Sequence, residues 1–181
     1  MDIIIIQGAP GSGKSETAKN LSIFFPKGVL IEIDTIRKMI ISVDWTNQKE
    51  HTSLLSASIP LIIEFINLQF IPIILVDTFS GNKISDFMSS LYNVNANVLV
   101  KIFTLYASND ELEKRLELRP FTKFKDFTIA KKINDEFANM HIITEFKIDT
   151  TGIDATEAAK IIYNNLPKKG DNNELLERNR S

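Results

Sequence analysis

A glycine-rich segment at residues 8–15 carries the most specific chemical signal in the chain. Its pattern is G-x-x-x-x-G-K-[ST], and its residues are Gly8, Ala9, Pro10, Gly11, Ser12, Gly13, Lys14 and Ser15. Glycines in such a loop let backbone N–H groups turn toward phosphate oxygens. We expect the loop and the adjoining Glu16 to contact a nucleoside triphosphate. Lys14 would reach its β- and γ-phosphates, and the Ser15 hydroxyl would bind Mg²⁺.

The residues on either side of the loop supply the context that such a motif requires. Residues 2–7 form a short apolar run typical of a buried strand, and residues 16–25 have helical spacing with no breaker before Pro26. The helix N-terminus would add its positive dipole end to the phosphate site. The order of strand, loop and helix therefore favours a phosphate-binding loop over a chance glycine-rich turn.

A carboxylate and a guanidinium follow the second strand-like run, residues 29–33. Asp34 comes directly after this run, and Arg37 follows one helical turn later. A carboxylate placed opposite the γ-phosphate can orient an alcohol and accept its proton, an effect of about 10²- to 10⁴-fold on rate. Arg37 could hold an anionic part of the acceptor. The alternative is that Asp34 is only a helix N-cap and Arg37 is solvated; the two roles of Asp34 are compatible.

A second carboxylate, Asp77, follows the third strand-like run, residues 71–76. Acidic residues at this position of phosphate-loop enzymes lie on the Mg²⁺ side of the site. Asp77 is therefore a candidate to hold the metal through water or to bind the acceptor. A carboxylate that only caps a turn at the end of a strand is an equally open alternative.

Two arginines, Arg115 and Arg119, are four residues apart in a segment of helical spacing and are expected to share one helical face. Pro120 ends this helix, and residues 115–128 are predicted to form a mobile lid. Such a lid would carry guanidinium groups to the transferring phosphate, where negative charge spreads over the oxygens. The alternative is a salt-bridged surface in which Arg115 pairs with Glu111.

Strand-like and helix-like segments alternate along the whole chain. Strands are predicted at residues 2–7, 29–33, 71–76, 97–106 and 146–148, and helices after the first loop at 35–42, 48–69, 83–92, 109–118, 128–139 and 154–165. This alternation predicts βαβ units and a five-stranded parallel sheet. Ligands of such sheets bind beyond the carboxyl ends of the strands, where the phosphate loop, Asp34 and Asp77 would meet.

The 181 residues have the size and composition of one globular domain. We predict that this domain spans residues 1–166 and that residues 167–181 form a polar, flexible tail. The chain has no cysteine, which excludes disulfides and thiolate zinc sites. His51 and His141 lack ligand spacing, which favours structural or incidental roles. No signal peptide or membrane-spanning pattern is found, which predicts a cytoplasmic protein with no membrane partner.

The combined pattern resembles the P-loop kinases of the nucleoside and nucleotide kinase-like group. The similarity covers residues 1–166 and extends to small kinases such as polynucleotide kinase, zeta toxins and chloramphenicol phosphotransferase. It implies an α/β fold, the three-layer αβα P-loop NTPase fold, with a short helical lid. It also implies that Asp34 is the base, that Arg37 contacts the acceptor and that Arg115 steadies the phosphates. Arg119, in the same segment as Arg115, is a further candidate to bind the nucleotide. Relatives often carry an arginine after the third strand, where this chain has only Lys83.

These features predict a kinase that uses ATP and Mg²⁺, with GTP as a possible donor, and transfers the γ-phosphoryl group to a hydroxyl. The acceptor would be a small molecule, a nucleoside or a nucleic-acid end; a net charge of −2 and a pI near 5.7 favour a small molecule. The alternatives are a nucleoside monophosphate kinase and a nucleotide-binding regulatory module. A switch GTPase is disfavoured because Gly81 lies one place too late for D-x-x-G. Monomer and homodimer remain equally open.

Overall fold

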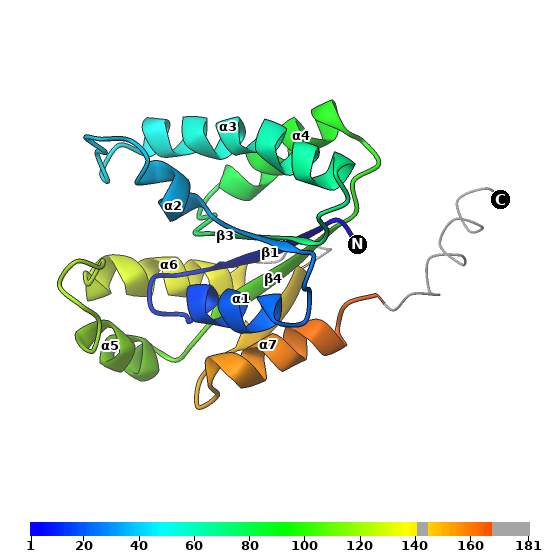
Figure 1. The fold of residues 1–181 in the computed structure, drawn as a ribbon. Coiled ribbons are helices and arrows are strands. Elements are labelled where there is room, and N and C mark those ends of the chain that lie inside the picture. The colour runs from blue at the N-terminus through cyan, green and yellow to red at the C-terminus, as the bar shows by residue number, and fades with distance from the viewer. Residues whose placement is uncertain (141–144, 168–181) are drawn as a thin grey trace.

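Five strands form a single parallel sheet in the computed structural model, which describes residues 1–140 and 145–167 (Figure 1). The order across the sheet is β2-β3-β1-β4-β5, so the strand that precedes the phosphate loop lies at the centre. Every pair of neighbouring strands is parallel. The strands are β1(Ile3–Gly8), β2(Val29–Glu32), β3(Ile73–Asp77), β4(Val100–Tyr106) and β5(Glu145–Asp149). The predicted five-stranded parallel sheet is therefore confirmed.

The central strand, β1, does not alternate between apolar and polar residues over positions 3–6, because both of its faces are buried. Ile3, Ile4, Ile5 and Ile6 are all fully buried. Ile3 and Ile5 belong to one apolar cluster, whereas Ile4 and Ile6 belong to another on the opposite face of the sheet. A parallel sheet is covered on both faces, so each successive side chain enters one of two cores. The run of isoleucines thus determines a central strand between two helical layers.

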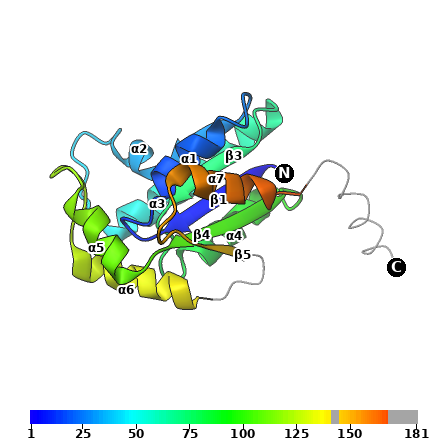
Figure 2. The ribbon, with the colours of Figure 1, turned by 90° about the horizontal axis from the view of Figure 1, so that it is seen from below.

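Helices cover both faces of the sheet, as Figures 1 and 2 show. α1(Lys14–Ser22) and α7(Ala155–Asn164) pack on one face, where Leu21 and Ile162 enter the core. α3(Gln48–Asn67) and α4(Lys83–Val94) pack on the other, where Ile59 and Phe87 are buried. The short α2(Ile33–Arg37) follows β2, and α5(Asn109–Glu117) and α6(Phe127–Asn139) form a helical pair after β4. The predicted three-layer αβα architecture is confirmed.

Side-chain caps set the starts of four helices. Asn47, Ser108, Asp126 and Asp154 each accept a hydrogen bond from a backbone N–H in the first turn of the helix that follows. These bonds satisfy donors that have no partner inside the helix. The four helices consequently begin close to the residues where their spacing predicts a start.

The second helix is shorter than the sequence predicts. Its spacing suggested residues 35–42, but α2 ends at Arg37. The backbone N–H groups of Met39 and Ile40 bond to carbonyls three residues back, at 3.1 Å each, so the chain leaves the helix through a tighter turn. Arg37 consequently lies at a helix end, next to the loop that leads to α3.

Two expectations concern the rest of the chain. Apart from Pro167, the predicted tail lies outside the described residues. No helix in the described part of the chain is long and apolar enough to cross a membrane.

Truncating a core isoleucine on α7 tests the packing of the helical layer that α1 and α7 form on one face of the sheet. We expect Ile162→Ala, at a fully buried position, to lower the free energy of unfolding by about 2–5 kcal/mol. Urea unfolding followed by circular dichroism measures this change. Ile41→Ala is the matched control, because Ile41 is fully exposed, and its effect should stay within about 0.5 kcal/mol. Equal effects of the two substitutions would contradict the packing described here.

Candidate active site

The phosphate loop connects the end of β1 to the start of α1. A β-carbon at position 8 would collide with the Leu105 carbonyl oxygen and the Ser12 hydroxyl, so the neighbouring strand can approach only a glycine. Gly13 occupies the N-cap position of α1 with a φ of 91°, which favours glycine as well. The loop is closed by a 3.1 Å bond from the Ser12 N–H to the Ala9 carbonyl. Its geometry therefore leaves the N-terminal N–H groups of α1 available to an anion.

Lys14 is the cation at the centre of the site. Its ammonium donates a 3.3 Å hydrogen bond to the carbonyl of Ala9, within the loop itself. Withdrawal from water lowers the pKa of Lys14 to about 8, although the carboxylates of Asp34 and Asp77 oppose this shift. The positive charge of Arg119 lowers the pKa of Lys14 further. Four residues that the sequence selected separately therefore interact electrostatically in one place.

Asp34 lies in the first turn of α2, and its side chain is exposed. The N-cap of α2 is Glu32, so the alternative interpretation of Asp34 as an N-cap is wrong. Within the described residues, no hydrogen bond or ion pair holds the Asp34 carboxylate. Its charge nevertheless acts on Lys14 and on Arg119. The carboxylate is thus available to a hydroxyl group that approaches the phosphate site.

Asp77 is buried at the end of β3 and pairs with a residue that the sequence did not select. His51 Nε2 of α3 lies 2.9 Å from Asp77 Oδ2, and both side chains are almost fully buried. The alternative in which Asp77 caps a turn is therefore not what the structure shows. No spacing signal could have found His51, because the two residues meet only when α3 packs on the sheet. His141 lies outside the described residues.

Ser15 and Glu32 bring a hydroxyl oxygen and a carboxylate oxygen together beside the phosphate loop. The Ser15 hydroxyl hydrogen-bonds to Glu32 Oε2 at 3.5 Å, across the gap between α1 and the end of β2. In the described part of the chain, no group of three His, Cys, Asp or Glu residues gathers as a metal cage. Mg²⁺ in nucleotide sites keeps water and phosphate ligands and needs only one or two protein oxygens. The pair fits such an ion, and Glu32 is a candidate that sequence reasoning missed.

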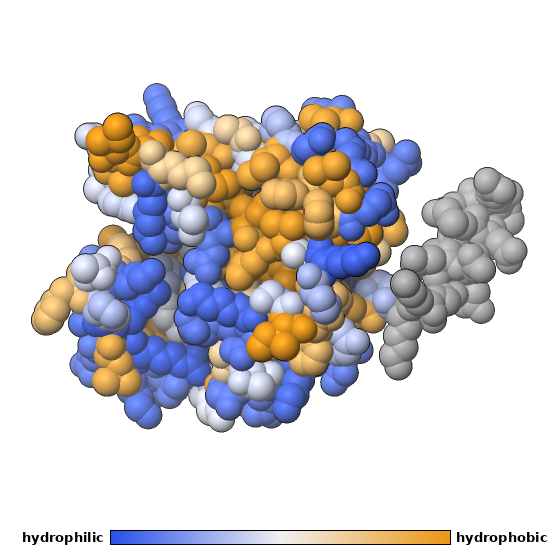
Figure 3. Space-filling view, in the orientation of Figure 1, coloured by the Kyte–Doolittle hydropathy of each residue, from blue (hydrophilic) through white to orange (hydrophobic). Residues whose placement is uncertain are grey.

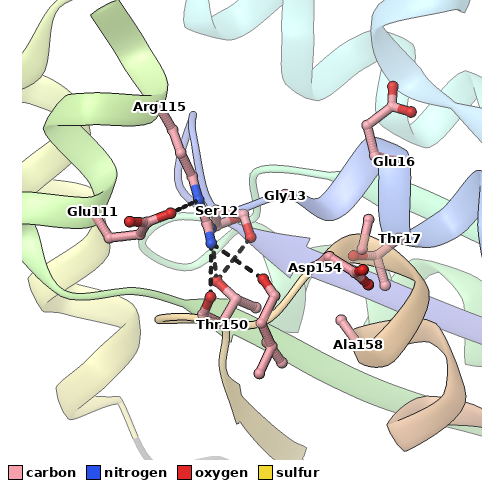
Figure 4. A pocket seen from close by; sticks show the side chains of 11 residues that line it. Ser12, Gly13, Glu16, Thr17, Glu111, Arg115, Thr150, Asp154 and Ala158 are labelled. Atoms are coloured by element: carbon pink, nitrogen blue, oxygen red, sulfur yellow. Dashed lines mark hydrogen bonds and ion pairs between the residues drawn. The ribbon is translucent and has the colours of Figure 1, made fainter. Parts of the chain in front are cut away.

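A pocket of about 320 Å³ lies beside the loop, between α5, α1 and the start of α7 (Figure 4). Two hydroxyl oxygens near it, Ser12 Oγ and Thr17 Oγ1, are buried without a partner among the described residues. The lining residues are Ser12, Gly13, Glu16, Thr17, Glu111, Arg115, Thr150, Ile153, Asp154, Ala155 and Ala158.

Arg115 lines this pocket and is held on three sides. Its Nε pairs with Glu111 at 2.8 Å, its Nη1 donates to the Thr150 hydroxyl at 3.0 Å, and its Nη2 donates to the Thr150 carbonyl at 2.7 Å (Figure 4). The Thr150 hydroxyl also lies 3.2 Å from the Ser12 carbonyl. The Glu111–Arg115 pair that the sequence offered as an alternative is therefore present, and it anchors the wall of the pocket to the phosphate loop.

Arg119 follows α5, and its charge acts on Lys14 of the phosphate loop. α5 ends at Glu117, so Arg119 lies past the helix and does not share a helical face with Arg115. Its Nη1 donates a 3.0 Å hydrogen bond to the Phe124 carbonyl. Burial lowers the pKa of Arg119, and the carboxylate of Asp34 opposes this shift. The predicted lid region therefore comprises the end of α5, the loop after it and the start of α6, and the charge of Arg119 in this loop acts on Lys14; movement of the lid stays a prediction.

Several solved structures have this architecture, and kinases are among them. The tunicamycin resistance protein of Deinococcus radiodurans aligns with 24% identity over 90% of this chain and 94% of that one, with a TM-score of 0.64. A gluconokinase from Sinorhizobium meliloti aligns with 14% identity over 91% and 98%, with a TM-score of 0.57. Thymidylate kinase from Candida albicans aligns with 16% identity over 99% and 92%, also with a TM-score of 0.57. The fold is therefore that of the small P-loop kinases.

A family model described as an AAA domain matches residues 3–140, which include the phosphate loop and four of the five strands. The chain belongs to this family of P-loop domains, the class that binds nucleoside triphosphates. No curated protein sequence is significantly similar to the chain. The roles of individual residues accordingly depend on the geometry described above.

The protonation of Lys14 offers a test of its place in the phosphate site. Since its pKa is about 8 in the free protein, about half of the molecules carry a neutral Lys14 at pH 8. Phosphate charge favours the ammonium, so binding of ATP at pH 8 should take up about 0.5 proton per site, and less at pH 6.5. Calorimetric titration in buffers of different ionisation enthalpy measures this number.

Two substitutions test whether Lys14 is the group that takes up this proton. Lys14→Met should remove the uptake at pH 8, whereas Lys160→Met, at an exposed position of α7, should leave it unchanged. Equal proton uptake by the Lys14→Met protein and the wild type would show that another group binds the proton.

Proposed function

We propose that the chain is a kinase that transfers the γ-phosphoryl group of ATP to a hydroxyl group of an acceptor. The observation that carries this proposal is the exposed Asp34 carboxylate, which no other side chain holds and which acts electrostatically on Lys14 of an intact phosphate loop. A kinase needs a carboxylate that can take a proton from the acceptor hydroxyl, whereas a module that only binds nucleotide does not. The family membership and the fold support the same proposal.

The nucleotide would lie across the N-terminus of α1. Its phosphates would contact the loop N–H groups and Lys14, and its base and ribose would occupy the pocket beside Arg115. Mg²⁺, when bound, neutralises phosphate charge. Ser15 and Glu32 would hold the ion, since their oxygen atoms already face each other.

The transfer itself requires one proton acceptor and positive charge around the γ-phosphate. Asp34 would orient the acceptor hydroxyl and take its proton as the new oxygen–phosphorus bond forms. The bond from the γ-phosphorus to the β,γ-bridging oxygen breaks, and ADP leaves with that oxygen. Lys14 and Arg119 would stabilise the charge that spreads over the γ-phosphate oxygens. We assign this role to Arg119 and not to Arg115, because the guanidinium of Arg115 is already bound to Glu111 and Thr150.

Removing the proposed base should slow the reaction without preventing nucleotide binding. We expect Asp34→Asn to lower kcat by about 10²- to 10⁴-fold and to change the Kd for ATP by less than about threefold. Transfer of radiolabelled γ-phosphate from ATP to pooled hydroxyl acceptors measures kcat, and competition with GTP reports the donor. Asp110→Asn is the matched control, because Asp110 is also exposed in the first turn of a helix. An Asp34→Asn enzyme with wild-type turnover would contradict the role of this carboxylate.

Substitutions of Arg115 and Arg119 should change different kinetic constants. Arg119→Gln is expected to lower kcat by about 10²- to 10³-fold, since it removes a charge that acts on the transferring phosphate. Arg115→Gln is expected mainly to raise the KM for ATP, because it disrupts the wall of the base pocket. Steady-state kinetics at varied ATP concentration distinguishes the two effects. The opposite pattern, with kcat lost in Arg115→Gln alone, would restore the assignment made from the sequence.

A further inference from the structure

A buried histidine of α3 holds one oxygen of a carboxylate at the carboxyl edge of the sheet. His51 Nε2 lies 2.9 Å from Asp77 Oδ2, and the two side chains are 7% and 4% exposed. An ionised carboxylate only accepts hydrogen bonds, so Nε2 is the donor. Among the described residues, Oδ1 of Asp77 has no hydrogen-bond or ion-pair partner. One oxygen of this carboxylate is therefore fixed, and the other can accept a hydrogen bond from a ligand.

The packing of α3 on the sheet does not depend on this pair. Leu55, Ile59 and Ile62 of the same helix are almost fully buried in the apolar cluster beneath it. A buried polar or ionic pair adds little net stability, because both groups lose their contact with water, and apolar residues in its place are often as stable. The orientation that His51 gives to Asp77 therefore explains the pair better than the stability of the fold does.

Further contacts fix the end of β3 and the loop that follows it. The Thr78 hydroxyl donates a 3.0 Å hydrogen bond to the carbonyl of Gly8, at the start of the phosphate loop. At the far end of the same loop, Lys83 donates a 2.9 Å hydrogen bond to the amide oxygen of Gln48, one turn before the histidine in α3. Residues 77–83 are thus attached to the phosphate loop on one side and to α3 on the other.

Asp77 lies close to the proposed base, because the two carboxylates follow neighbouring strands. Glu32 of β2 is opposite Val76 of β3, so Asp77 and Asp34 come one and two residues after a paired position. Neighbouring strands are about 4.8 Å apart, a distance that two hydroxyl groups of one small molecule can bridge. The surface is hollowed at the left edge of Figure 3, between the upper half with α2 and α3 and the lower half with α5 and α6. This hollow leaves an approach for a second substrate.

We propose that His51 is a positioning residue for phosphoryl transfer, which holds Asp77 so that its other oxygen accepts a hydrogen bond from a second hydroxyl of the acceptor while the reacting hydroxyl faces Asp34. The acceptor is then a diol or a larger polyhydroxy compound. This inference rests on the proposed kinase function. His51 acts through Asp77 and does not touch the substrate. An acceptor held at two points rotates less, which keeps its reacting hydroxyl in place for transfer.

The first test measures the binding of a minimal diol and does not depend on catalysis. Trp45, the only tryptophan of the chain, lies between α2 and α3. The guanidinium carbon of Arg37 is 4.6 Å from the centre of its ring; Arg37 is buried, so the alternative in which it is solvated is wrong. The protein is saturated with Mg²⁺ and the β,γ-imido analogue of ATP. cis-1,2-Cyclohexanediol and cyclohexanol are then titrated separately, and the fluorescence of Trp45 is followed.

We expect the diol to bind about tenfold more tightly than cyclohexanol, since it makes one more hydrogen bond. His51→Leu has no donor and should remove this preference. His51→Gln retains an N–H and should keep the preference within about threefold. Ser58→Ala is the matched control, because Ser58 is a buried polar residue of the same helix that bonds to the Leu55 carbonyl, and it should bind as the wild type does.

Circular dichroism establishes that each variant is folded. If His51→Leu does not fold, Asp77→Asn takes its place, since it replaces one accepting oxygen by an amide donor, and the same loss is expected. Equal affinity of the wild type for the two alcohols, or no saturable change with the diol, overturns the proposal. A folded His51→Leu protein that still prefers the diol does so as well.

Transfer from radiolabelled ATP separates this inference from the kinase proposal. Label is measured on the two alcohols and on the pooled acceptors. A KM for the diol that is about tenfold below that for cyclohexanol, and that rises about tenfold in His51→Leu with the KM for ATP unchanged, supports both proposals. Equal KM values for the two alcohols overturn the role of His51 and leave the kinase. Selective diol binding that is lost in His51→Leu, with no label on any acceptor, supports the positioning of Asp77 and contradicts the kinase.

Discussion

Positive charge withdrawn from water at the carboxyl edge of the sheet is the constraint on which the site depends. Burial lowers the pKa of Lys14, Lys83 and Arg119, and Arg37 is buried without an ion pair in the described chain. Each of these cations is less stable than it would be in water. An anion beside such cations would favour their charged form and offset part of this cost.

The sheet makes this arrangement possible because it is covered on both sides. With helices on both faces, the strands can be almost entirely apolar, and polar chemistry is confined to the edge where the strands end. The phosphate loop follows the central strand, so it lies between the segments that follow β3 and β4, the two neighbours of that strand. Asp34 and Asp77 follow β2 and β3 on one side of this loop, whereas Thr150 follows β5 on the other.

These positions divide the site into two halves with different characters. On the side of α5 and α7, hydrogen bonds from Arg115 to Glu111 and Thr150, and from Thr150 to Ser12, connect the pocket wall to the loop. These hydrogen bonds hold this half in shape within the protein itself, as a preorganised binding pocket requires. On the side of α2 and α4, the hydrogen bonds that Arg37 and Lys83 donate among the described residues go to neutral oxygens, the Asp44 carbonyl and the Gln48 amide.

Sequence alone determined the parts of this protein that depend on neighbours along the chain. The isoleucines of β1, the glycines and Lys14 of the loop, and the alternation of strands and helices act through local geometry, so the parallel sheet and the phosphate site could be predicted. The helix ends were less certain: α5 stops at Glu117, which separates Arg119 from the face that carries Arg115. Only the tertiary structure decided which polar groups meet. His51 and Asp77, Ser15 and Glu32, and Gln48 and Lys83 come from different elements. Their approach is set by how helices pack on the sheet, and no spacing along the chain records it.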